Sequence, residues 1–286
     1  MTPAEHVADA ARVLAAAGVP SDDARHDAVV LGRWVLGWSQ AEWLARARDE
    51  APADFAGRFL RLVRRRANRE PVAYITGTRE FYGRPFVVTP DVLVPRPESE
   101  LVVEEALGIL AGRTPGFAQR VADIGAGSGC LSVTLALECP TAHLLAIDVS
   151  EAALRIAHEN ARALGAVDRI EFWRGAYLPR GVAPFDLVVA NPPYIALADR
   201  DALPVEVRAF EPAQALFGGP DGLGVIRAMV PEAAAGLVSG GWLVVEIGAG
   251  QSAEVGRIVA DTGSLTVSHI RTDLQSIPRV VVARKA

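Results

Sequence analysis

The sequence contains few cysteines, the residues that build disulfide frameworks and thiolate metal sites. Its 286 residues include only two cysteines, Cys130 and Cys139, and their spacing is not the CxxC spacing of zinc or redox motifs. Both fall within one predicted strand–helix unit, so we interpret them as reduced residues that contribute to packing. We expect no metal site.

Membrane features and excess positive charge are missing as well. The first ten residues, MTPAEHVADA, lack the basic and apolar regions of a signal peptide, and no uninterrupted apolar run approaches the roughly 18 residues that a membrane span needs. The formal net charge of −5 argues against extended binding to a nucleic-acid backbone, although a local basic face stays open. We therefore expect a cytoplasmic protein with no membrane partner and no stable nucleic-acid partner.

The most specific pattern that is present is Asn191-Pro192-Pro193-Tyr194, which follows the apolar run 185–190. Prolines carry no backbone N–H, and a residue before proline favours an extended conformation, so this stretch offers acceptors but few donors. The Asn191 side-chain oxygen and the Pro192 carbonyl could each accept one hydrogen of a planar –NH2 group, with the Tyr194 ring against its flat face. The pattern predicts methyl transfer to a planar nitrogen; a strand followed by a proline turn is the structural alternative.

A glycine-rich loop, DIGAGSG at residues 123–129, joins an apolar strand to a helix-like segment. Its glycines follow a GxGxG spacing, whereas the dinucleotide fingerprint GxGxxG would need a glycine at Cys130. The next apolar run ends in Asp148, a position from which a carboxylate can accept both hydroxyls of a ribose. Together the loop and Asp148 predict a site for adenosine without a pyrophosphate, although each alone is also typical of an ordinary strand–helix connection.

The first seventy residues predict a small bundle of helices. Capping-box patterns begin at Thr2 and Ser39, Ser21 is expected to cap another helix, and Gly18 and Gly37 are expected stops. Residues 53–69 combine an apolar stripe with a face of six arginines, at positions 58, 61, 64, 65, 66 and 69. We interpret that face as solvated, and as the best candidate on the chain for docking an acidic or RNA-bearing partner.

Hydrophobic residues make up 50% of the chain, enough to bury one large or two modest cores. Residues 71–98 read as a β-hairpin linker, because prolines and glycines separate short β-type runs. From residue 99 onward strand-like and helix-like segments alternate, which predicts an α/β fold with a doubly wound sheet. The expected segments are helices at 101–111, 129–138 and 150–164, strands at 120–124, 143–147, 168–173 and 185–190, and three later strands in GWLVVEIG, SLTVSHI and PRVVVAR. Ligands in such folds lie at the carboxyl ends of the strands, where Gly125, Asp148 and Asn191 all fall.

These segments carry a resemblance to a known family. The strings REPVAYITGTREFYGRPFVVTPDVLVPRPESE, DIGAGSGCLSVTLA, AIDVSEAALRIAHENA, FDLVVANPPYI, VRAFEPAQALFGGPDGL and GGWLVVEIGAGQ together resemble the HemK/PrmC family over nearly the whole chain. The resemblance implies a class I methyltransferase that transfers a methyl group from S-adenosylmethionine to the side-chain amide nitrogen of the glutamine in the Gly-Gly-Gln motif of peptide chain release factors. The other product would be S-adenosylhomocysteine, and the partner would be met either free or on the ribosome.

The same resemblance implies an architecture: a helical substrate-docking domain at 1–70, a hairpin linker at 71–98, and a Rossmann-like domain at 99–286 whose seven-stranded sheet ends in an antiparallel strand. It also assigns roles to residues. Asn191 and Pro192 would be catalytic, and Asn191 to Tyr194, including Pro193, would hold the glutamine. The cofactor contacts would be Asp123, Gly125, Ala126, Gly127, Ser128, Gly129, Asp148, Ala176 and Asn191.

The chain departs from the family pattern at three places. Ser99 replaces the threonine of a motif usually read as RPETE, and it keeps the hydroxyl. Gly175 and Ala176 stand where an acidic residue and a bulky neighbour are usual, so contacts to the adenine would come from backbone N–H groups. The C-terminal segment lacks a glycine that is usual there, and we assign it no role although Arg279 is kept.

Other functions stay open on the sequence alone. A nucleic-acid amino-methyltransferase could use the same tetrapeptide on a flipped adenine or cytosine, but the net charge of −5 and the lack of a further recognition domain favour it less. A paralogue that methylates another protein or a small molecule is a related alternative. A cofactor-binding scaffold without chemistry is a third, and the intact Asn191 and Asp148 speak against it.

Overall fold

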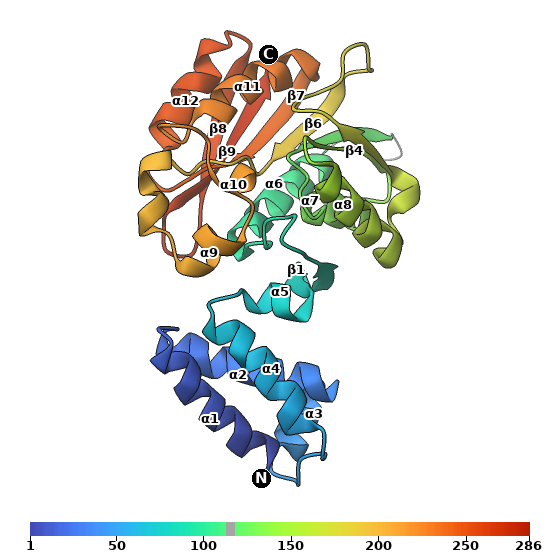
Figure 1. Cartoon of the computed structure of the whole chain (residues 1–286). Helices are drawn as coiled ribbons and strands as arrows, with labels where there is room; N and C mark the ends of the chain where they lie inside the picture. Colours follow the sequence, from blue (N-terminus) through green and yellow to red (C-terminus); the bar gives the residue numbers. More distant parts are fainter. Residues whose placement is uncertain (113–117) are drawn as a thin grey trace. The chain divides into compact units, whose positions relative to one another are not determined.

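The computed structural model describes residues 1–112 and 118–286 (Figure 1). It divides the chain into two compact units. The first comprises Met1–Thr78 and Pro204–Phe210, and the second comprises Arg79–Leu203 and Glu211–Ala286. Each unit buries apolar side chains of its own.

The first unit is a helical bundle, as the capping patterns predict. Thr2 and Ser39 each form a complete capping box, whereas the prediction for Ser21 is wrong: Ser21 is the first helical residue, and Pro20 before it makes no side-chain cap. The helices end close to Gly18 and Gly37, both of which have positive φ. The elements are α1 (Pro3–Ala16), α2 (Ser21–Leu36), α3 (Gln40–Arg46), α4 (Phe55–Ala67) and α5 (Val72–Thr76).

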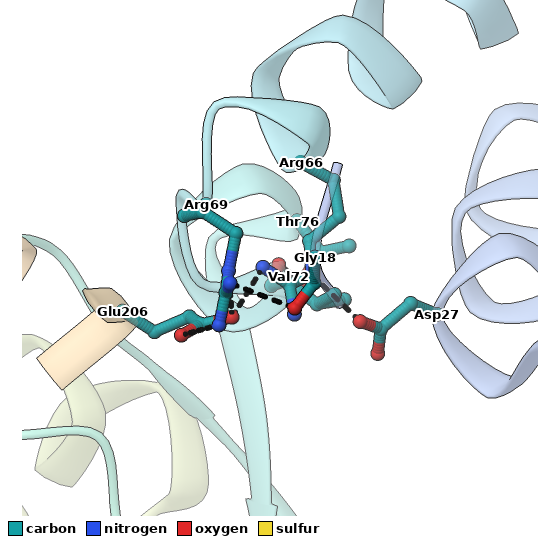
Figure 2. Close-up of polar contacts among 7 residues, drawn as sticks. All are labelled: Gly18, Asp27, Arg66, Arg69, Val72, Thr76 and Glu206. Carbon is teal, nitrogen blue, oxygen red and sulfur yellow. Dashed lines mark hydrogen bonds and ion pairs between the residues drawn. The ribbon is translucent and has the colours of Figure 1, made fainter. Parts of the chain in front are cut away.

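The arginine face of α4 is not uniformly solvated, which corrects the interpretation from sequence. Arg66 is 5% exposed. Its Nε donates to Asp27 Oδ2 at 2.7 Å, and another of its nitrogens lies 2.9 Å from Glu206 Oε1. Arg69 reaches both Glu206 oxygens, at 2.7 Å each, and the Gly18 carbonyl (Figure 2). Glu206 lies in α9 (Val205–Phe210), so these ion pairs explain why a segment so distant in sequence belongs to the first unit.

The charges of this cluster depend on one another. Burial opposes ionisation of Glu206, but hydrogen bonds from Arg69 and Arg66 outweigh it and lower its pKa. Burial also raises the pKa of Asp27, and the neighbouring Arg66 counteracts that shift. Removal of Arg66 would leave the Asp27 carboxylate without its cation, whereas Glu206 would keep its ion pair with Arg69.

We expect Arg66→Ala to lower the opening free energy of the first unit by about 3 kcal/mol, because it leaves the partly buried Asp27 carboxylate without its cation. The exposed Arg61, on the same helix, is the matched control, and Arg61→Ala should change that free energy by less than about 0.5 kcal/mol. Hydrogen exchange of the α2 and α4 amides measures both values. Equal effects of the two substitutions would show that the cluster adds no stability.

The second unit contains a seven-stranded sheet of order β5-β4-β3-β6-β7-β9-β8 (Figure 1). Neighbouring strands are parallel from β5 through β7, and β9 is antiparallel to both of its neighbours, which confirms the expected fold. The strands are β3 (Gln119–Ile124), β4 (Ala142–Asp148), β5 (Ile170–Arg174), β6 (Phe185–Ala190), β7 (Leu237–Glu246), β8 (Leu265–Thr272) and β9 (Pro278–Lys285). A hairpin of β1 (Thr78–Phe81) and β2 (Arg84–Val87) precedes it in the chain.

Helices cover both faces of the sheet. Alternate strand residues point to opposite sides, and both sets are apolar, so each face packs against helices. Val121 and Leu144 belong to a core with α6 (Glu100–Ala111), α7 (Cys130–Glu138) and α8 (Glu151–Leu164). Ala122 and Leu145 belong to the other, with α11 (Gly224–Gly236) and α12 (Ser252–Asp261). The short elements are η1 (Pro97–Ser99), η2 (Val167–Arg169), η3 (Leu197–Ala202) and α10 (Ala213–Leu216). Among the described residues, no helix combines the length and apolar character needed to cross a membrane.

The strand register places four residues in one row across the sheet. Ile124 pairs with both Ile147 and Ala190, and Ala190 pairs with Val245. The residues that follow, Asp148, Gly125, Asn191 and Glu246, therefore lie side by side where β4, β3, β6 and β7 end. Because the chain runs outward from β3 to β5 and then returns to β6, this row spans the switch point at which such folds bind ligands.

Candidate active site

A cleft of about 340 Å3 opens at this end of the sheet, within the second unit. Most of the residues predicted to bind cofactor or substrate line it. From the glycine loop these are Gly125, Ala126, Gly127 and Ser128. From the other strand ends they are Asp148, Ala176, Asn191, Pro192 and Pro193. Asp123, Gly129 and Tyr194 are not part of the lining.

The glycine loop is bound tightly to the end of β4. The N–H groups of Gly125 and Ala126 both donate to the Ile147 carbonyl, at 2.8 and 2.9 Å, and the N–H of Gly127 donates to Asp148 Oδ2 at 2.9 Å. These donors are engaged inside the protein, so the loop does not present a row of N–H groups to a phosphate. This geometry agrees with the expectation of a nucleoside rather than a pyrophosphate.

Gly129 allows two helices to pack closely and does not line the cleft. A Cβ built on it would lie 3.0 Å from the Ala157 Cβ and 3.1 Å from the Ala157 Cα, and its φ is +78°. Helices α7 and α8 therefore approach each other at this glycine, which also stands at the start of α7. Its predicted contact with the cofactor stays a prediction.

The Asp148 carboxylate is held rigidly at the cleft wall. Its Oδ2 accepts from the Gly127 N–H, and its Oδ1 accepts from the Ser150 N–H at 2.8 Å. Each carboxylate oxygen can accept more than one hydrogen bond, so both oxygens can still accept the hydroxyls of a ribose. The Asp148 carbonyl accepts from the Gly175 N–H at 3.0 Å, so that N–H is engaged within the protein, while Ala176 and Tyr177 after it line the cleft.

Glycine at position 175 has a local steric reason. A Cβ there would lie 2.7 Å from the Trp173 Nε1, so any larger side chain would displace the tryptophan. The glycine at position 175, where the family usually has an acidic residue, is thus explained by Trp173, whose side chain occupies the space next to it.

Asp123 lies behind the loop and is fully buried. One of its oxygens accepts from the Ser132 N–H at 3.1 Å, and the other has no partner among the described residues. Burial, helped by the nearby charge of Asp148, raises the pKa of Asp123 to about 7. Asp123 therefore supports the start of α7, and its predicted contact with the cofactor stays a prediction.

Asn191 presents the acceptor that the sequence predicts. Its Nδ2 donates to the Ser99 Oγ at 2.9 Å, so the nitrogen side of the carboxamide is engaged within the protein. Its Oδ1 accepts no hydrogen bond from the described residues. With Pro192 and Pro193, which have no N–H, Asn191 forms a cleft wall that accepts hydrogen bonds and does not donate them.

Tyr194 is held by hydrogen bonds within the protein and is not part of the cleft lining. Its hydroxyl donates to Glu246 Oε1 at 3.2 Å, its carbonyl accepts from Gln251 Nε2 at 2.9 Å, and burial raises the pKa of its phenol. Its role in stacking on a substrate group stays a prediction.

Two residues to which the sequence analysis gave no role support this wall. Ser99, at the end of η1, and Glu246, at the end of β7, are each 1% exposed, and the Ser99 Oγ donates to Glu246 Oε2 at 2.6 Å. Burial is the main reason that the pKa of Glu246 rises to about 7. For Glu246 the signal in the sequence was an acidic residue that ends an otherwise apolar strand, because such a residue is rarely buried without a partner. For Ser99 it was the hydroxyl kept in the RPESE motif.

We expect Gly129→Ala to destabilise the protein by about 1–3 kcal/mol more than Gly165→Ala. Both glycines have φ near +78°, so the two substitutions share the strain of a left-handed backbone, but a Cβ at Gly165 meets nothing within 4 Å. The difference in free energy of unfolding, from urea titrations, thus measures the approach of α7 to α8. Equal losses would mean that the helices can separate without cost.

The chain is similar to known protein families and proteins. The family model described as the PrmC N-terminal domain matches residues 5–77, and the model described as the methyltransferase small domain matches residues 102–216. Proteins named release factor glutamine methyltransferase are similar over most of the chain. One from Bradyrhizobium diazoefficiens is 40% identical over 92% of this chain and 89% of its own. One from Moorella thermoacetica is 40% identical over 99% and 98% of the two chains.

Solved structures share the fold at low sequence identity. The hMettl16 catalytic domain, solved in complex with MAT2A 3'UTR hairpin 6, has a TM-score of 0.57 at 15% identity and covers 80% of this chain and 81% of its own. A methyltransferase from Pyrococcus furiosus has a TM-score of 0.53 at 16% identity, with 81% and 99% covered. At these identities the likeness concerns the fold alone.

Proposed function

The chain belongs to the family of release factor glutamine methyltransferases, and from this membership we propose that its cleft methylates the side-chain amide nitrogen of a release factor glutamine. The methyl donor is S-adenosylmethionine. The observation that carries the assignment of the site is the wall formed by Asn191 and the two prolines, which accepts hydrogen bonds without donating them and lies in the same row as Gly125 and Asp148.

The cleft residues fit that cofactor. Asp148 has a fixed carboxylate with spare acceptor capacity for ribose hydroxyls, and the loop from Gly125 to Ser128 brings backbone rather than bulky side chains to the lining. Ala176 offers backbone to a base. When bound, S-adenosylmethionine supplies a methyl group on a positively charged sulfur.

The Asn191 wall suits a substrate nitrogen that is a weak nucleophile. A glutamine amide is almost non-basic, because its lone pair is delocalised into the carbonyl, and no side chain near neutral pH is a strong enough base to remove its proton first. We propose that Asn191 Oδ1 and the Pro192 carbonyl accept one N–H hydrogen each. They would then fix the amide and stabilise the positive charge that grows on its nitrogen, and the surplus N–H proton is released to solvent water after the methyl transfer.

The magnitudes indicate which effect is larger. Holding two reactants in a near-attack geometry contributes up to about 7–11 kcal/mol, whereas one acceptor placed at a developing charge contributes about 3 kcal/mol. Positioning therefore dominates, and rigid support for Asn191 matters as much as its identity.

We further propose that the partner is the release factor protein itself, free or on the ribosome, without stable binding of this chain to nucleic acid. The net charge of −5 supports this, because phosphate backbones are bound through excess positive charge.

Mass spectrometry of a candidate release factor tests the function directly. After incubation with the protein and S-adenosylmethionine, we expect the peptide that holds Gly-Gly-Gln to gain the mass of one methylene group on its glutamine. Parallel reactions with duplex DNA and with RNA are the comparison arms. Methylation of a nucleic acid with no change in the release factor would contradict the proposal.

Asn191→Ala should leave the affinity for S-adenosylmethionine within a few-fold of the wild-type value while kcat falls by about a hundred-fold or more, because it removes an acceptor needed in the transition state. Asp148→Asn is the matched comparison, and it should weaken cofactor binding most, since one of its oxygens becomes a donor. Calorimetry with the cofactor and a labelled-methyl assay measure the two effects. Unchanged turnover in Asn191→Ala would remove the proposed role of that residue.

A further inference from the structure

A chain of buried hydrogen bonds runs behind Asn191. The Asn191 Nδ2 donates to the Ser99 Oγ at 2.9 Å, the Ser99 Oγ donates to Glu246 Oε2 at 2.6 Å, and the Tyr194 hydroxyl donates to Glu246 Oε1 at 3.2 Å. Three separate segments contribute: η1 provides Ser99, the end of β6 provides Asn191 and Tyr194, and the end of β7 provides Glu246. Ser99 and Glu246 do not themselves accept the substrate's hydrogens in the mechanism above.

The direction of each hydrogen bond follows from the donors available. An ionised carboxylate can only accept, and a serine hydroxyl has a single hydrogen to give. When Ser99 gives that hydrogen to Glu246, whatever faces Ser99 from the other side must be a donor. The only donor on the Asn191 side chain is its Nδ2, so the ionised Glu246 selects one of the two ways in which the carboxamide can be turned.

We propose that Ser99 and Glu246 are positioning residues that hold the Asn191 carboxamide with its nitrogen inward, so that its oxygen is the group offered to the substrate amide. This inference rests on the proposed function of Asn191. A carboxamide turned the other way would present an N–H donor to a substrate group that is itself a donor, and the substrate amide would be repelled rather than held.

Protonation of Glu246 removes this selection. A neutral carboxyl group can donate its own hydrogen to Ser99, which frees the serine hydrogen to point at Asn191 and to favour the inverted carboxamide. Three other groups act on Glu246. Glu98 raises the pKa of Glu246, whereas Tyr194 and Arg279, which lies on β9, lower it. Cys130 on α7 is also close enough for its pKa to be raised by Glu246.

The sign of the pH effect follows from the raised pKa of Glu246, which is about 7. The ionised form orients Asn191, so turnover is favoured above that pH and decreases as the pH falls through it. The pH dependence of folding stability has the opposite sign. Because the unfolded chain ionises more readily, the contribution of Glu246 to folding stability is fully present below the unfolded pKa and is lost as the pH rises toward the folded one.

Turnover of three variants tests the positioning role. We expect Ser99→Ala to lower kcat for release factor methylation by about ten-fold to a hundred-fold, with cofactor affinity and the KM for release factor within about three-fold of wild type. Ser99→Thr keeps the hydroxyl and should recover most of the loss. Glu246→Gln should flatten the acidic limb of the kcat profile between about pH 6 and pH 9. Asp123, whose pKa is also about 7, is unchanged in that variant, so the difference between the profiles isolates Glu246.

A second measurement needs no substrate. The side-chain amide signal of Asn191 in a 1H–15N spectrum, assigned by its absence from Asn191→Ala, should move with a midpoint near pH 7 in the wild-type protein. That movement should vanish in Glu246→Gln, and the signal should exchange faster with water in Ser99→Ala. Circular dichroism of each variant identifies any that fail to fold, in which case Ser99→Thr and the wild-type titration still decide the question.

The two measurements separate failure of this inference from failure of the proposed function. An Asn191 amide signal that ignores pH and is the same in all variants overturns the positioning role, whatever the protein methylates. A kcat profile that keeps its acidic limb in Glu246→Gln does the same. If the Asn191 amide signal titrates as expected but no release factor is methylated, the positioning role of Ser99 and Glu246 is retained and the proposed substrate is rejected.

Discussion

In the proposed mechanism, the chemistry of the cleft depends on the hydrogen bond from Asn191 to Ser99. It exists because the β6–β7 register brings Asn191 beside Glu246, and because Ser99 stands between them with one hydrogen to give. A buried carboxylate is costly, and this one is tolerated because two hydroxyls donate to it. The buried carboxylate fixes the orientation of the Asn191 carboxamide, which burial of apolar side chains alone could not specify.

The glycine loop shows the same use of fixed hydrogen bonds. Its N–H groups bind the end of β4, so Asp148 and the loop move as one piece. The positive φ values at Gly125 and Gly127 let the backbone turn toward its neighbours without a Cβ in the way. Gly129 has a different purpose, since it lets α8 approach α7. Three glycines in one motif thus answer to two separate constraints, and the spacing alone does not distinguish them.

The fold and the position of the cleft could be predicted from sequence because both follow from local patterns. Apolar runs locate the strands, and the strand ends locate Gly125, Asp148 and Asn191. The support behind Asn191 could not be predicted, since Ser99 and Glu246 are 147 positions apart and meet only through the sheet order. The interpretation of Arg66 as a solvated residue was wrong for the same reason. Helical periodicity placed Arg66 on a polar face, whereas its partner Glu206 lies in a distant segment. Pairs of charged residues remote in sequence are set by tertiary structure and leave no local pattern.

A wall that only accepts hydrogen bonds also selects its substrate. A glutamine amide can satisfy two acceptors with its two N–H hydrogens, whereas a glutamate carboxylate has none and would place its charge against acceptor oxygens. The ionised form of the buried Glu246 would add to that repulsion. Rejection of this kind is strong, because buried acceptors left without donors lose their hydrogen bonds to water and gain nothing in return. In the proposed mechanism, the same oxygens that orient an amide therefore disfavour its acid.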